Sequence, residues 1–281
     1  MKHLSFSLSL IILWVASFAQ NMHADLFVGI SNYQGDLQGK RFTLNQSHPA
    51  IGLGVSYDLS TKFVIRTGLT YGKVEGNDKT NTAAKGIEFR NLNFKSNITE
   101  LQLAIEYNLF DLSYRDISPY AFAGVALYHF NPYTNQVNGN KVFLNPLSTE
   151  GQGLSQYPDR KPYKLTQFAI PFGAGVKFFL SDNLEAGLEI GLRKLFTDYL
   201  DDVSMNYVDS ATLFMARGTQ AVDLAYRGDE VAGGPGFPTE GTQRGSAKFK
   251  DWYYFSGIRL SYRLNNKKSS GNKLSCPGKV Y

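Results

Sequence analysis

Apolar residues alternate with small or polar ones along Ile51-Gly52-Leu53-Gly54-Val55-Ser56-Tyr57-Asp58-Leu59. Successive side chains of a β-strand point to opposite faces, so this stretch would carry one apolar face and one polar face. The same period of two recurs at 101–109, 184–193 and 254–264. A tilted strand needs roughly 9–11 residues to cross a bilayer, and these segments are about that long.

Segments of this kind occur eight times, and we predict strands at 24–35, 50–59, 62–72, 97–109, 118–130, 164–180, 184–196 and 252–264. The connections after the second, fourth and sixth strands are short. Those at 36–49, 73–96, 131–163 and 197–251 are long. Strict alternation of tight turns and long loops is typical of outer-membrane barrels, whose turns lie in the periplasm. We therefore predict an all-β fold: an eight-stranded antiparallel transmembrane β-barrel with short periplasmic turns, long extracellular loops and periplasmic termini.

The composition agrees with many short strands. The 281 residues include 20 Phe, 17 Tyr, 2 Trp and 27 Gly, which favours aromatic strands over a helical core. Aromatic residues near the predicted strand ends could form girdles at the membrane interfaces or could be ordinary core residues, and the loop alternation favours girdles. These aromatics are Tyr57, Phe63, Tyr71, Tyr107, Phe110, Tyr120, Tyr128, Phe130, Phe178, Phe196, Trp252, Tyr254 and Tyr262.

The chain begins with features of a secretory signal peptide. Lys2 precedes an apolar run at 4–18, and Ser17 and Ala19 are small residues at the −3 and −1 positions of a cleavage site after Ala19. The run is short for a transmembrane helix, so an uncleaved anchor is the less favoured alternative. We predict a signal peptide at 1–19, the barrel at 20–264 and a basic periplasmic tail at 265–281.

The net charge of +5 comes from the two ends of the chain. Without Lys2 and the four lysines of the tail, 24 basic residues face 24 acidic ones. The sequence pI near 9.0 therefore predicts no nucleic-acid partner. The single cysteine also lies in the tail, where an oxidising compartment would favour an intermolecular disulfide. The tail residues that we expect to bind a periplasmic partner are Lys267, Lys268, Lys273, Cys276 and Lys279.

Charged residues also occupy the predicted inward faces of the strands. An eight-stranded barrel is just wide enough for its interior side chains, so these charges would have to pair. We expect a plugged, salt-bridged lumen without an open channel. A catalytic carboxylate pair of Glu185 and Glu189 is a much less favoured interpretation. The predicted lumen charges are Asp58, Arg66, Glu100, Glu106, Lys177, Glu185, Glu189, Arg193, Arg259 and Arg263.

The longest loop opens with an acidic motif that contains Asp198, Tyr199, Asp201 and Asp202. Carboxylates at this spacing could bind calcium, but the pattern lacks the glycine and terminal glutamate of an EF-hand. A solvated turn that caps the barrel rim is the favoured interpretation. An Asp/His protease that uses His129 at the same rim is a remote alternative. Motifs for nucleophilic catalysis, phosphate, dinucleotide or zinc binding are absent, so we expect no enzyme activity and no cofactor.

A further indication comes from seven segments taken together: SNYQGDL (31–37), GLTYG (68–72), SPYAFAGV (118–125), HFNP (129–132), TEGQG (149–153), QFAIPFG (167–173) and TDYLDDVS (197–204). They resemble the PorG-like family of Bacteroidota outer-membrane barrels. This resemblance implies an accessory barrel of type IX secretion and, in some organisms, gliding. It also implies partners in a periplasmic ring of a PorK/GldK-like lipoprotein and a PorN/GldN-like subunit. A surface adhesin or defence barrel that acts through its loops is the alternative function.

Overall fold

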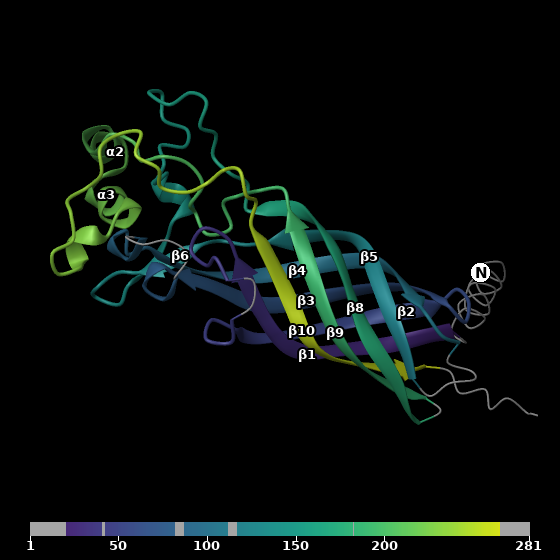
Figure 1. The fold of residues 1–281 in the computed structure, drawn as a ribbon. Helices are drawn as coiled ribbons and strands as arrows, with labels where there is room; N and C mark the ends of the chain where they lie inside the picture. Colours follow the sequence, from purple (N-terminus) through teal and green to yellow (C-terminus); the bar gives the residue numbers. More distant parts are fainter. Residues whose placement is uncertain (1–20, 41–42, 82–86, 112–116, 182, 265–281) are drawn as a thin grey trace, which may run out of the picture.

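The computed structural model describes residues 21–40, 43–81, 87–111, 117–181 and 183–264. Eight strands follow one another around a closed antiparallel barrel, and the last strand pairs with the first (Figure 1). The predicted eight-stranded antiparallel β-barrel is confirmed. The barrel strands are β1 (Met22–Gln34), β2 (His48–Asp58), β3 (Phe63–Asn77), β4 (Asn93–Asn108), β5 (Ile117–His129), β8 (Thr166–Ser181), β9 (Leu184–Leu195) and β10 (Trp252–Arg263). The predicted signal peptide and basic tail lie outside the described residues.

The β3–β4 hairpin is longer than the sequence pattern predicted. We expected these strands to end at residue 72 and to begin at residue 97, but pairing continues to Asn77 and Asn93. The extension keeps the alternation, because Val74 and Phe94 are fully buried on its inner face. Its outward residues are polar, which made this part of the hairpin resemble a loop.

The outer surface of the barrel is a belt of apolar side chains. Leu53, for example, is 66% exposed although it lies in the middle of a strand. Exposed apolar surface of this extent is costly in water and is what the lipid-facing wall of a membrane barrel requires. The chain thus has the fold of an outer-membrane barrel. The belt includes Val28, Ile51, Leu53, Val55, Leu69, Leu101, Leu103, Ile105, Val125, Leu127, Phe168, Ile170, Leu188 and Ile258.

No helix in the described part of the chain is both long and apolar enough to span a membrane.

The aromatic residues divide between the two interpretations. Phe63, Tyr107 and Tyr262 are exposed near strand ends, as girdle residues would be, whereas Tyr71 is exposed in the middle of β3. By contrast, Tyr120, Tyr128 and Phe130 are buried inside the barrel, so their assignment to a girdle was wrong. They lie at positions of β5, or just after it, that alternate with the outward residues. That these residues are aromatic did not reveal whether they face the lumen or the lipid.

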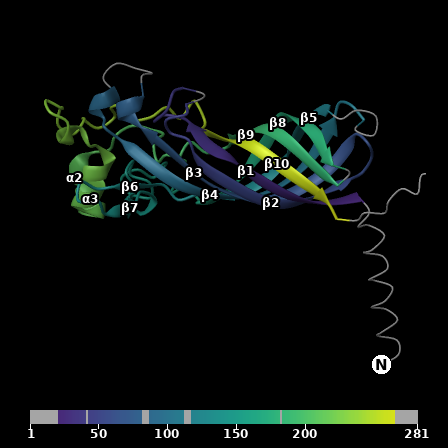
Figure 2. The same ribbon diagram turned by 90° about the horizontal axis from the view of Figure 1, so that it is seen from below.

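The four long connections form a loop cap at one end of the barrel, and the three short turns lie at the other end (Figure 1, Figure 2). We define the loop cap as the described residues of 35–47, 78–92, 130–165 and 196–251. The sequence did not predict its short elements. They are β6 (Tyr133–Asn135), β7 (Lys141–Phe143), α2 (Ser210–Arg217), α3 (Thr219–Ala225) and the 3-10 helices η2 (Asp78–Thr80), η3 (Ile87–Phe89), η4 (Asn145–Leu147) and η5 (Gly228–Glu230).

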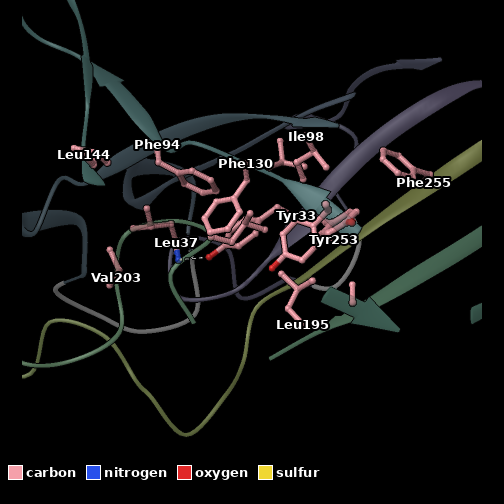
Figure 3. Packing of buried hydrophobic residues seen from close by; sticks show 14 of the residues in the cluster. Tyr33, Leu37, Phe94, Ile98, Phe130, Leu144, Leu195, Val203, Tyr253 and Phe255 are labelled. Atoms are coloured by element: carbon pink, nitrogen blue, oxygen red, sulfur yellow. Dashed lines mark hydrogen bonds between the residues drawn. The ribbon is translucent and has the colours of Figure 1, made fainter. Parts of the chain in front are cut away.

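One hydrophobic core runs from the barrel into the loop cap (Figure 3). Tyr33 of β1 packs edge-to-face against Phe94 of β4, with ring centroids 4.8 Å apart. Tyr253 of β10 belongs to the same cluster, and so do Leu200 and Val203 of the longest loop. The loop cap is therefore packed onto the barrel rather than suspended above it.

Candidate functional site

Ion pairs fill the lumen, starting at the loop end. The guanidinium of Arg193 on β9 donates to both carboxylate oxygens of Glu100 on β4, with Nε to Oε2 at 2.9 Å and Nη2 to Oε1 at 2.9 Å. The hydroxyl of Tyr253 on β10 donates to the same carboxylate at 2.6 Å. Glu100 is fully buried. This group spans the barrel immediately below the hydrophobic core.

A second group surrounds Glu106 in the middle of the lumen. Its carboxylate accepts hydrogen bonds from Arg66 at 3.3 Å and Arg259 at 2.9 Å, and it also pairs with Lys177. Arg66 continues to Glu189, with Nη1 to Oε2 at 2.6 Å. Because β3, β4, β8, β9 and β10 all contribute, these pairs connect opposite walls of the barrel.

The network continues to the turn end. Lys177 lies 4.0 Å from Glu185, and Asp58 lies 3.9 Å from Arg263 and 2.9 Å from His23 Nε2. All ten predicted lumen residues thus lie in this lumen network or at its mouth. Further members that the sequence did not indicate include His23, Tyr120, Tyr253 and Asp25, which pairs with Arg259 at 2.7 Å. The inward parity of their strands was the signal that could have found them.

Little free space remains between these side chains. A cavity of about 60 Å³ is lined by Arg66, Glu189, Arg193 and Arg259, among others. Both carboxylates of the alternative catalytic pair are occupied, since Glu189 binds Arg66 and Tyr120, and Glu185 lies beside Lys177. The geometry therefore matches a structural plug better than an acid–base site.

We expect the purified barrel to produce no stable large single-channel steps in planar bilayers. The buried ion pairs occupy the cross-section, and opening it would separate charges in a confined interior. A porin of known conductance in the same membrane controls for insertion. Large, long-lived steps from this protein would contradict the plug.

A wider chamber opens at the turn end. Its volume is about 690 Å³, and its walls include Asp58, Lys177, Glu185 and Arg263. We call this space the turn-end vestibule. It ends where Lys177 meets Glu106. The floor of the vestibule is therefore the lower side of the lumen network.

The acidic motif at the start of the longest loop is buried. Asp198 is 2% exposed, and Asp201 and Asp202 are each 1% exposed. The interpretation of this segment as a solvated turn was therefore wrong. The reason is that Leu200 and Val203 of the same motif enter the hydrophobic core, which takes the aspartates inside with them. Tyr199 stacks on Tyr163 of the neighbouring loop, with centroids 4.8 Å apart.

Hydrogen bonds satisfy two of these aspartates. Asp202 accepts from the hydroxyls of Thr149 at 2.5 Å and Tyr163 at 2.7 Å. Asp201 accepts from the Tyr33 hydroxyl and, at 2.9 Å, from the Val203 backbone N–H. The motif thus joins the longest loop to β1 and to the loop after β5.

Two arginines, the buried Arg244 and the half-buried Arg90, tie the four loops together. Arg244 donates to Glu150 Oε1 at 2.9 Å, to the Asp202 carbonyl at 2.6 Å and to the Ala225 carbonyl at 3.0 Å. Arg90 donates to Asp78 at 2.6 Å and 2.8 Å and to the carbonyl of Arg244. It reaches the first loop as well, at the carbonyl of residue 36. The loop cap is consequently one hydrogen-bonded body.

Burial changes the acidity of the aspartates in the loop cap. It raises the pKa of Asp198 to about 7 and that of Asp202 to about 6, in the second case against the lowering effect of Arg244. It also holds the pKa values of Asp201 and Asp251 well above the usual range. The Ser204 side chain beside Asp198 lowers the pKa of Asp198, but burial outweighs it.

The metal and protease alternatives gain no support from this arrangement. Among the described residues, no group of three or more His, Cys, Asp or Glu side chains is arranged to hold a metal ion. His129 lies at the rim, where its Nδ1 is 2.9 Å from the hydroxyl of Thr166. The structure brings Asp198, Asp201 and Asp202 together as part of the packed loop cap.

The raised pKa of Asp198 predicts a loop cap that loses stability as the pH rises. Between about pH 4 and about pH 7 the folded state keeps a proton that the unfolded state has lost, so ionisation opposes folding. Asp198→Asn should therefore stabilise the loop cap relative to the natural chain by about 2 to 4 kcal/mol at pH 8, with little change at pH 4. Hydrogen exchange of α2 and α3 at both pH values measures this difference.

Asp159→Asn is the matched control, because Asp159 is an exposed carboxylate of the same cap. It should leave the pH dependence unchanged. An Asp198→Asn variant with the same pH dependence as the natural chain would show that ionisation of Asp198 does not oppose folding.

The chain is similar to several solved membrane-protein structures, all at low identity. Neisserial surface protein A is 7% identical, with a TM-score of 0.41 over 86% of this chain and 96% of that chain. Ail from Yersinia pestis, in complex with the heparin analogue sucrose octasulfate, is 7% identical, with a TM-score of 0.40 over 86% and 97%. OprG from Pseudomonas aeruginosa is 9% identical, with a TM-score of 0.40 over 87% and 97%.

No curated protein matches the sequence closely enough to count as a relative. A family model, described as a domain of unknown function (DUF6089), matches residues 2–215. Because this match covers most of the chain and seven of its eight barrel strands, the protein belongs to the DUF6089 family.

Proposed function

We propose that this protein is a non-enzymatic outer-membrane barrel that anchors a periplasmic lipoprotein ring of a type IX secretion or gliding complex. The observation that carries the proposal is the contrast between a lumen filled by ion pairs and a charged vestibule at the turn end. A plugged barrel is poorly suited to transport, but it is a rigid support for a partner. In this proposal the turn end faces the periplasm.

The turn-end vestibule offers both signs of charge to such a partner. Asp58 and Glu185 line it together with Lys177 and Arg263, and the side chain of Arg263 is 37% exposed. The chain leaves β10 at this mouth, and the four lysines of 265–281 follow. Vestibule and tail would together contact the ring of PorK/GldK-like and PorN/GldN-like subunits.

A surface adhesin or defence barrel is the second candidate, and the loop cap is the observation that favours it. The outer side of the loop cap carries a groove of about 590 Å³ whose lining includes Arg160, Met205 and Lys248. Phe214 and Met215 on α2 are 50% and 83% exposed. Apolar side chains displayed on an ordered surface are suited to contact with another molecule.

Crosslinked pull-downs from the native envelope separate the two candidates. The full chain should recover a lipoprotein and a ring subunit, and deletion of 265–281 should lose both. The double variant Phe214→Ser/Met215→Ser is the matched control on the loop cap, and it should keep them. Recovery of neither ring component by the full chain would refute the anchoring role. Loss of cell adherence in the loop-cap variant alone would favour the adhesin.

A separate prediction concerns a covalent link through the tail. If Cys276 forms an intermolecular disulfide, non-reducing gels of whole envelopes should show a high-mass band that Cys276→Ser removes. An unchanged band pattern in that variant would exclude the covalent link but not the noncovalent anchor.

A further inference from the structure

The two edges of the apolar belt differ in charge. Toward the loop end, the outward row of β3 passes from Tyr71 to Lys73, and that of β9 passes from Leu192 to Lys194. The parity of β9 is clear, because Arg193 binds Glu100 inside the lumen while Lys194 is exposed. On each of these two strands, the first outward residue beyond the apolar belt is therefore a lysine.

Two neighbouring strands repeat this arrangement. Lys164 lies two residues before Thr166, the first residue of β8, on which the outward Phe168 is 67% exposed. Lys250 precedes Trp252 at the start of β10. Both lysines are exposed. Since β8, β9 and β10 are adjacent in the barrel, Lys164, Lys194 and Lys250 all lie on the loop side of its wall, with Lys194 opposite Ile170 and Trp252.

Among the described residues, the outward positions at the turn end are mostly apolar or aromatic, with Lys62 as an exposed lysine. Arg263 at the same end faces the mouth of the lumen, where it lies 3.9 Å from Asp58. In the described part of the chain, exposed lysines beside the belt are therefore concentrated at its loop end. The outward residues of the turn end include Phe63, Tyr107, Leu109, Ile117, Leu180, Tyr262 and Leu264.

The loop-end lysines lack protein counter-ions. None of Lys164, Lys194 and Lys250 forms an ion pair with a carboxylate among the described residues, although Lys250 Nζ donates to the Ala247 carbonyl at 3.0 Å. By contrast, Lys95 at the same edge lies 3.7 Å from Glu75. Unpaired cations beside a lipid-facing surface are suited to anions supplied by the membrane itself.

Aromatic residues accompany the three lysines. Trp252 is paired across the sheet with Lys194 and packs edge-to-face on Phe172, with centroids 6.0 Å apart. Indole rings favour the level of lipid headgroups, because one part of the ring is apolar and its N–H is polar. Trp252 therefore marks the headgroup level beside Lys194, and Lys250 and Lys164 follow on the loop side of it.

We propose that Lys164, Lys194 and Lys250 bind the phosphate groups of a membrane lipid in the leaflet around the loop end of the barrel. The ammonium groups act as point charges toward phosphate oxygens, while the acyl chains lie on the apolar residues of β8 and β9. This binding surface orients the barrel, since the turn end has no matching group of outward lysines among the described residues.

Native mass spectrometry of the full chain in detergent micelles, titrated with bisphosphorylated lipid A, tests this proposal. Each lysine near an anionic headgroup contributes roughly fivefold to binding, so the triple variant Lys164→Gln/Lys194→Gln/Lys250→Gln should bind roughly 100-fold more weakly. The triple lysine-to-arginine variant should retain binding. Heat-modified gel mobility verifies that each variant is a folded barrel.

The controls identify the chemistry. The variant Lys40→Gln/Lys79→Gln/Lys248→Gln removes three exposed lysines of the loop cap and should bind lipid A as the natural chain does. Dephosphorylated lipid A should bind the natural chain as weakly as lipid A binds the triple glutamine variant, and inorganic phosphate should not compete. The proposal would be overturned if the triple glutamine variant lost less than tenfold in lipid A binding, or if the control variant lost as much. Undiminished binding of the dephosphorylated lipid, or full competition by inorganic phosphate, would also overturn it.

Discussion

Replacing Glu106 with alanine should lower the free energy of unfolding of the barrel by about 3 to 5 kcal/mol. The carboxylate is fully buried and pairs with Arg66, Arg259 and Lys177 at once. Without it, three cations share the middle of the lumen and retain only their second partners. Breaking a buried pair costs far more than its net contribution, because the charges that remain have lost both water and partner.

Urea unfolding in lipid vesicles, followed by the fluorescence of Trp252, measures this loss. Glu75→Ala is the matched control, because Glu75 lies on the neighbouring strand β3 and also pairs with two groups, His48 and Lys95. Its side chain is 22% exposed, so its removal should cost less than about 1 kcal/mol. Equal losses in the two variants would mean that the position of Glu106 inside the lumen has no special energetic role.

Replacing Arg244 with methionine should destabilise the loop cap by about 3 to 5 kcal/mol and leave the barrel folded. Methionine keeps much of the volume but leaves Glu150 fully buried without its cation. The carbonyls of Asp202 and Ala225 also lose their donor. These groups belong to two different loops, so the packing between the loops should weaken.

Hydrogen exchange should show faster exchange in α2 and α3 of the Arg244→Met variant, while protection in β1 to β5 is retained. Arg217→Met is the control, because Arg217 is exposed at the end of α2 and should cost less than about 0.5 kcal/mol. Adding Glu150→Gln to Arg244→Met should recover part of the loss, because the lone buried charge disappears. Unchanged exchange in the single variant would contradict the role of Arg244.

The barrel was predictable from sequence because one face of every strand meets lipid. This requirement imposes a period of two that is visible in a single sequence, as at residues 51–59. The same alternation placed Arg66, Glu106 and Arg259 inside. It failed for the extension of β3 and β4, where the outer face leaves the membrane and Lys73 and Glu75 become acceptable outward residues.

The loop cap could not be predicted in the same way. Its stability depends on contacts between residues far apart in the chain, such as Arg90 with the carbonyl of Arg244 and Asp36 with the N–H of Ser246. No period relates such partners, and an aspartate-rich motif normally indicates exposure. The burial of Asp201 follows only once Leu200 and Val203 are known to enter the core.

The pairing of β1 with β10 has a consequence for how the barrel inserts into the membrane. Ala24 lies opposite Tyr262, so the first and the last barrel strands, nearly the whole sequence apart, must meet before the wall is complete. Until then β1 and β9 each present unpaired N–H and C=O groups, which hydrocarbon does not tolerate. Insertion is therefore an all-or-none event that waits for the final strand to be synthesised. A nascent chain that stops before Trp252 has two open edges and no stable place in a bilayer.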